Sequence, residues 1–80
     1  MPRLRTLSSK EVVKILEGFG FAVMTQKGSH IKLVRSTIEG RQVLTIPENK
    51  ELPVGTLKAI YNQTNRFVSH EEMHKYFYHE

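Results

Sequence analysis

The residue types that could do chemistry in this chain gather around one histidine, in the segment QKGSHIKLV. His30 directly follows Gly28 and Ser29. Lys27 precedes that pair, and Lys32 lies two residues after the histidine. A histidine titrates near neutral pH and can transfer protons without a metal ion, and lysines and the N–H groups of a glycine turn can hold a phosphate. These groups together suit cleavage of an RNA phosphodiester, in which a base removes the 2′-OH proton and positive charge stabilises the phosphorane.

Composition limits the kind of protein that can carry this site. The chain has 80 residues, 39% of them hydrophobic, and no cysteine. A chain of this size forms one domain, expected here over residues 1–80, without a deep enclosed cavity. No apolar run is long enough to span a membrane and no secretory signal is recognisable, so we expect a soluble, cytoplasmic protein. The net charge of +4 favours an anionic partner.

The acidic residues argue against a metal-dependent nuclease. All eight are glutamate and none is aspartate. Sites that hold paired Mg²⁺ ions rely on clustered carboxylates, commonly those of aspartate. We therefore expect no metal site. We expect no small-molecule cofactor either.

The elements that must position His30 begin with a helix, in the segment LSSKEVVKILEGFGF. Ser8 and Glu11 have the spacing of a capping box, and Leu7 and Val12 have that of a hydrophobic staple. The helix is expected to end at Gly20, a C-terminal cap.

Three short segments of apolar and β-branched residues follow and predict an antiparallel sheet. Within the second strand, Ile31 and Leu33 point toward the core, and Arg35 shares their side. His30 and Lys32 then fall on the opposite face, which an antiparallel sheet can leave open to solvent. The predicted strands are residues 21–26, 30–36 and 41–46.

Two further helices are predicted after the sheet. The segment FVSHEEMHKYFYHE repeats the start signal of the first helix, with Ser69 as its cap. Its aromatic residues 76–78 are adjacent, so at least one of them should be exposed. The order α-β-β-β-α-α predicts an α+β domain whose helices cover one face of a three-stranded antiparallel sheet. In the preceding helix TLKAIYNQT and its flank, the apolar side is predicted to be Val54, Leu57, Ile60 and Tyr61.

Several blocks of the sequence resemble, in the same order, the HicA family, the small toxins of HicAB toxin–antitoxin systems. The blocks are SSKEVVKILEGFGF, GSHIKL, VLTIP and GTLKAI, and the resemblance runs from Leu4 to Ile60. It implies a double-stranded-RNA-binding-like α-β-β-β-α fold, to which this chain adds a short C-terminal helix. It also implies an endoribonuclease, an mRNA interferase that cleaves mRNA without metal through the histidine of the Gly-Ser-His motif, here His30. A HicB-type antitoxin protein is expected to bind the toxin and cover that histidine.

The resemblance also assigns the residues around His30. Gly28 and Ser29 carry over from the family motif as an RNA-contacting turn and hydroxyl, whereas Lys27 and Lys32 are added here for their charge. Many relatives, as the resemblance suggests, have a histidine two positions after the proline that ends the third strand, where this chain has Asn49. The general acid therefore stays open, with water or Lys32 assisting the leaving group.

A zinc peptidase is a competing function, because HEEMH fits the His-Glu-x-x-His pattern of zinc sites. The residues would be His70, Glu71 and His74. A third ligand is lacking, since six residues follow His74 and His79 is poorly placed on the helical face. The presence of Glu71 is better explained by the favourable effect of negative charge at the start of a helix than by a zinc site. The histidines are then expected to face solvent.

A non-catalytic RNA-binding module of the same fold is the stronger alternative. Such domains recognise A-form RNA by its shape and by its phosphates. Its phosphate contacts would be Lys27, Lys32, Arg35 and Arg41.

Overall fold

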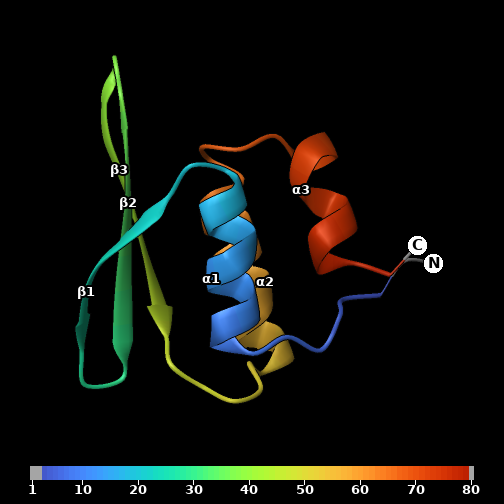
Figure 1. Ribbon diagram of the computed structural model, residues 1–80. Coiled ribbons are helices and arrows are strands. Elements are labelled where there is room, and N and C mark those ends of the chain that lie inside the picture. Colours follow the sequence, from blue (N-terminus) through green and yellow to red (C-terminus); the bar gives the residue numbers. More distant parts are fainter. Residues whose placement is uncertain (1–2, 80) are drawn as a thin grey trace.

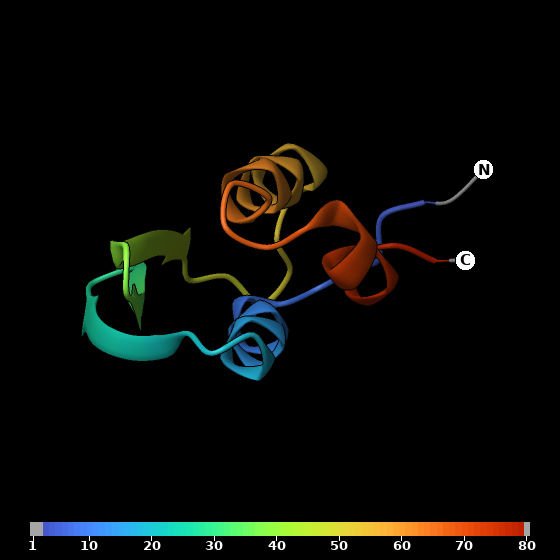
Figure 2. The same cartoon turned by 90° about the horizontal axis from the view of Figure 1, so that it is seen from above.

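A computed structural model shows a three-stranded sheet with helices packed against one of its faces (Figure 1). The structure describes residues 3–79. Seen from above, α3 lies beyond α1 and α2, on their side away from the sheet (Figure 2). The predicted α+β fold with its open sheet face and additional C-terminal helix is confirmed. The elements are α1 (Ser9–Gly18), β1 (Ala22–Lys27), β2 (His30–Thr37), β3 (Gly40–Pro47), α2 (Val54–Thr64) and α3 (His70–Phe77).

Local hydrogen bonds define both ends of α1. The Glu11 N–H donates to the Ser8 hydroxyl (3.1 Å) and the Ser8 N–H donates to the Glu11 carboxylate (2.9 Å), which completes the predicted capping box. Hydrogen bonding of the Glu11 carboxylate by Ser8, first through the Ser8 N–H and then through the Ser8 hydroxyl, lowers the pKa of Glu11. After the helix, Gly20 adopts a φ of +96° and its N–H donates to the Glu17 carbonyl at 3.0 Å. This left-handed residue ends α1 and turns the chain into β1.

The central strand of the sheet is β2, which pairs antiparallel with β1 on one side and β3 on the other. Two-residue turns, at 28–29 and 38–39, join the strands. Gly28 adopts a φ of +56°, a conformation that tight hairpin turns require and that glycine reaches without steric cost. The turn brings Lys27 of β1 opposite His30 of β2.

The core lies between the inner face of the sheet and the helices. Leu33 is fully buried there, as expected from the alternation of β2. Val54 was predicted on the apolar side of α2 but is 63% exposed, because it is the first residue of the helix and lies at an end that nothing covers. Of the adjacent aromatic residues 76–78, Tyr76 is 42% exposed, as predicted. The core also includes Val12, Leu16, Leu44, Ile46, Leu57, Ile60 and Tyr61.

One side chain, Arg35, connects three parts of the chain on the inner side of the sheet. Its Nε donates to Gln42 Oε1 on β3 at 2.7 Å. Its Nη1 donates to the Phe19 carbonyl at the end of α1, and its Nη2 to the Phe67 carbonyl between α2 and α3, both at 2.9 Å. The guanidinium also lies 4.8 Å from the centroid of the Phe21 ring. Arg35 thus lies on the side of Ile31 and Leu33, as expected, and its guanidinium is already bonded within the fold, which does not fit the phosphate contact that the alternative RNA-binding module assigned to it.

The segment before α1 holds α3 in place together with the core. Met73 and Phe77 of α3 are fully buried. The Arg5 N–H donates to the Phe77 carbonyl, and the His79 N–H donates to the Arg3 carbonyl, each at 2.7 Å. The two ends of the described chain thus lie side by side, on the side of the molecule away from the sheet (Figure 1).

Candidate functional site

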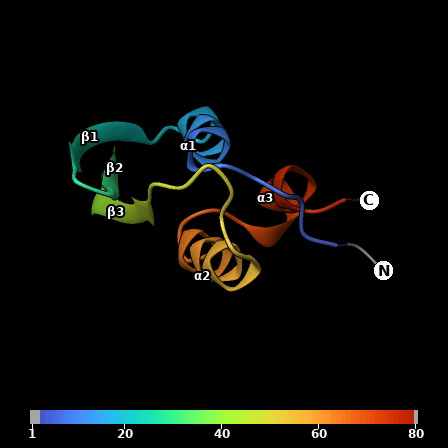
Figure 3. The same ribbon diagram turned by 90° about the horizontal axis from the view of Figure 1, so that it is seen from below.

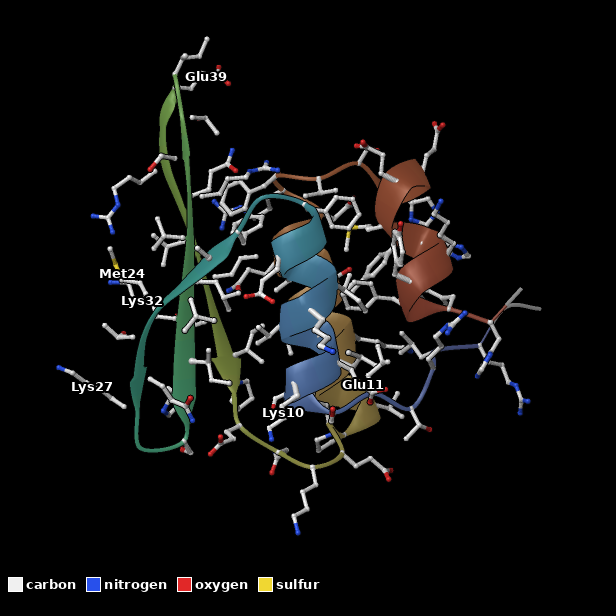
Figure 4. All side chains as sticks on the ribbon, viewed as in Figure 1. Lys10, Glu11, Met24, Lys27, Lys32 and Glu39 are labelled. Carbon is white, nitrogen blue, oxygen red and sulfur yellow. The ribbon has the colours of Figure 1, made fainter. Side chains whose placement is uncertain are left out.

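The face of the sheet that no helix covers carries His30, the first residue of β2. Its side chain is exposed, whereas the next residue, Ile31, faces the core and is 5% exposed. Lys27 is the residue paired with His30 on β1, and Lys32 lies two residues along β2 on the same face. Figure 4 shows Lys27 and Lys32 projecting away from the helices. The fold therefore gathers one imidazole and two ammonium groups on the open face.

The turn that precedes His30 is anchored by the segment after β3. The Glu48 N–H donates to the Ser29 carbonyl at 2.6 Å. The Glu48 carboxylate accepts a hydrogen bond from Gln26 Nε2, also at 2.6 Å. A Cβ added at Gly28 would meet no atom within 4 Å, so this glycine serves the backbone conformation and leaves the turn accessible. His30 therefore starts from a turn that hydrogen bonds hold at both ends.

Next to Lys32, a row of aliphatic residues crosses the open face. Ala22 pairs with Val34, and Val34 pairs with Val43, so one row of residues crosses all three strands. Met24 lies where the β1–β2 register shifts, in a β-bulge, and its Sδ is 3.3 Å from Arg41 Nη2. Met24 is 53% exposed and Val43 is 40% exposed. We call Ala22, Met24, Val34 and Val43 the aliphatic strip.

Sequence reasoning did not identify the aliphatic strip. The outward side of β2 and β3 contains Val34 and Val43 by simple alternation, and that signal was available. The residues that β1 contributes could not be predicted by alternation, because the bulge at Met24 changes which residues of that strand face outward.

A second histidine does not share the open face with His30. On β3, the residue paired with His30 is Pro47. The remaining histidines in the described part of the chain lie in α3 or just after it. Lys27 and Lys32 are thus the titratable side chains that accompany His30 on this half of the face.

Asn49 lies where relatives are expected to have a second histidine, and here its backbone takes part in hydrogen bonds that hold the fold. The Asn49 N–H donates to Ser9 Oγ at 3.2 Å, and the Asn49 carbonyl accepts from the Ser9 N–H at 3.0 Å. Ser9 itself is buried, 2% exposed. These bonds fix the β3–α2 connection against the start of α1 (Figure 3).

The histidines of the HEEMH segment contact aromatic side chains. His70 Nδ1 and the Tyr61 hydroxyl form a hydrogen bond, and the His74 ring stacks on Tyr78 with centroids 4.5 Å apart. Burial of the Tyr61 ring raises the pKa of that phenol. His70 is nevertheless exposed, as expected, whereas His74 is half-buried, so the expectation of solvated histidines holds in full only for His70. Within residues 3–79, no three His, Cys, Asp or Glu side chains gather closely enough to hold a metal ion.

Comparison with known proteins gives one finding at the level of a family. Residues 9–65 match a family model described as HicA toxin of bacterial toxin–antitoxin. The matched range covers α1, the three strands and α2, and it ends before α3. No curated protein and no solved structure matches the chain. None of the helices in the described range is long and apolar enough to cross a membrane.

Proposed function

Because the chain belongs to the HicA family of bacterial toxin–antitoxin toxins, we propose that it is an mRNA interferase, a metal-independent endoribonuclease whose catalytic residue is His30. One observation carries the proposal. The exposed His30 shares an uncovered sheet face with Lys27 on the paired strand and Lys32 on its own strand. Cleavage of a phosphodiester needs this combination of a proton-transfer group and nearby positive charge.

In the proposed reaction, the neutral imidazole of His30 takes the proton of a ribose 2′-OH. The 2′ oxygen then attacks the adjacent phosphorus, and the bond to the 5′ oxygen breaks. The products are a 2′,3′-cyclic phosphate and a 5′-OH end, with the leaving oxygen taking a proton from water or from Lys32. Lys27 and Lys32 stabilise the charge of the phosphorane.

The turn before His30 contributes to binding in this proposal. Gly28 and Ser29 contact the RNA backbone through the turn N–H groups and the Ser29 hydroxyl. The net charge of +4 favours an mRNA substrate. A HicB-type antitoxin binds the protein in the cytoplasm and covers His30 until the toxin is released.

Cleavage of single-stranded RNA by the purified protein in the presence of EDTA tests this function. We expect fragments with cyclic phosphate ends from the unsubstituted protein, and a rate lower by about a hundredfold or more for His30→Ala. His79→Ala is the matched control, because His79 is also exposed but follows α3 on the far side of the molecule. Its rate should be unchanged, and both variants should keep the native circular dichroism spectrum.

The alternative, a non-catalytic RNA-binding module of the same fold, gives a different result. RNA would then bind to the protein without being cut, and His30→Ala would not change the fragment pattern. That outcome would refute the enzymatic proposal and leave Lys27, Lys32 and Arg41 as phosphate contacts.

A further inference from the structure

We propose that the aliphatic strip, together with Arg41, is the surface on which the antitoxin docks, whereas RNA is held by the basic half of the same face around His30. This inference rests on the proposed function and deepens it. It states that antitoxin binding and RNA binding depend on different side chains. A substitution can therefore weaken one kind of binding without weakening the other.

The strip is a continuous surface rather than scattered apolar residues. The pairs Ala22–Val34 and Val34–Val43 place three side chains in one row across the sheet. Met24 lies on the same side, next to Arg41 of β3. Figure 4 shows Met24 on the side of the sheet away from the helices, near Lys32. Contiguous exposed aliphatic groups beside polar ones are typical of a protein–protein contact.

The chemistry of the strip fits a protein better than RNA. Single-stranded RNA binds through stacking on aromatic rings or guanidinium planes and through contacts to phosphates. Ala22, Met24, Val34 and Val43 offer neither a ring nor a hydrogen-bond donor in their side chains. Of the groups suited to RNA, His30 and Lys27 lie beside the 28–29 turn, and Lys32 lies between them and the strip.

Charge indicates which protein surface fits. The three strands contain four basic residues and no acidic one. A second copy of this chain would therefore bring Arg41 and the lysines against like charges, which is unfavourable. The complementary surface is apolar with a carboxylate that faces Arg41. The antitoxin that the family implies is the partner to which we assign this chemistry.

Two substitutions in the strip, Met24→Lys and Val43→Lys, test the inference. The probe is the purified protein encoded by the reading frame that adjoins the gene of this chain, and its affinity is measured by titration calorimetry. We expect each substitution to weaken binding by about tenfold or more, while the RNA cleavage rate stays within about twofold. Val54→Lys is the matched control, since Val54 is an exposed valine on α2 and should bind the probe normally.

A third variant separates the two halves of the face. His30→Ala should abolish cleavage yet bind the probe within about threefold of the unsubstituted protein, because in this inference the antitoxin covers the imidazole but takes its affinity from the strip.

Three outcomes would overturn the inference. The first is an unchanged affinity of the strip variants, and the second is an adjoining protein that does not bind at all. The third is a parallel loss of cleavage and of RNA binding in folded strip variants, which would make the strip an RNA surface. If the unsubstituted protein cuts no RNA but the affinity of the probe still depends on Met24 and Val43, the proposed function is wrong and the docking surface is supported.

Discussion

Replacing Arg35 by methionine should remove a large part of the stability of the fold. Methionine keeps an unbranched apolar side chain on the inner side of the sheet but lacks the guanidinium. The Phe19 and Phe67 carbonyls and the Gln42 amide oxygen would each lose a donor that now lies within 2.7–2.9 Å. Three separate chain segments would then lose their common hydrogen-bond partner.

The size of the effect follows from these bonds. A hydrogen bond to a charged group contributes about 1.5–3 kcal/mol. The three bonds share one side chain and are only partly buried, so their contributions are not additive and we expect a total loss of about 3 kcal/mol. A domain of this size has a free energy of unfolding of about 4–12 kcal/mol. The midpoint of thermal unfolding should therefore fall by about 12–24 °C.

Urea denaturation followed by circular dichroism measures the loss. Arg66→Met is the matched control, because Arg66 is exposed and its guanidinium is 5.8 Å from the Phe67 ring centroid; we expect a loss below about 0.5 kcal/mol. Arg35→Lys keeps the charge but cannot reach three acceptors at once, so most of the loss should remain. A loss below about 1 kcal/mol for Arg35→Met, or one equal to that of Arg66→Met, would refute the role assigned to the guanidinium.

Two further predictions concern the ends of α1. Gly20→Ala should cost about 1–2 kcal/mol, because the residue has a φ of +96° and its new Cβ would lie 3.3 Å from Arg35 Cδ. Gly18→Ala, where a Cβ meets nothing within 4 Å, should be neutral or stabilise by up to about 1 kcal/mol; equal losses at both sites in thermal unfolding would contradict this. The pKa of Glu11 is lowered by its bonds to Ser8, so its contribution is present above the pKa of an unfolded glutamate and is lost as the pH falls through the lower folded value. Glu11→Gln should therefore weaken the fall in stability below about pH 5, and an unaltered pH profile would contradict the capping box as its cause.

Much of the fold could be predicted because its signals are local. The capping box of Ser8 and Glu11 lies within four residues of the chain, and Gly20 carries its own conformational signal. Alternation within β2 was enough to assign Ile31 to the core and His30 to the open face. Most strand ends lie one residue away from the predicted limit, which is the usual uncertainty of such boundaries.

The features that escaped prediction depend on residues distant in the chain. Arg35 bonds to carbonyls 16 and 32 residues away, and no spacing rule connects such positions. His70 is drawn to Tyr61 by the packing of α3 on α2 rather than by any local motif. The bulge at Met24 depends on the register between β1 and β2. The aliphatic strip could therefore be identified only from the structure of the sheet.

The pairing of Arg3 and Arg5 with the last residue of α3 and with His79 has a practical consequence. A short peptide could join residue 79 to residue 3 across this small gap, and new termini could then be opened in a surface turn, since circular permutation succeeds where ends are adjacent and exposed. Fluorophores or purification tags attached beyond residue 3 or residue 79 would start from the side of the molecule behind the helices (Figure 1). They would leave the opposite, uncovered side of the sheet free for surface immobilisation and binding measurements.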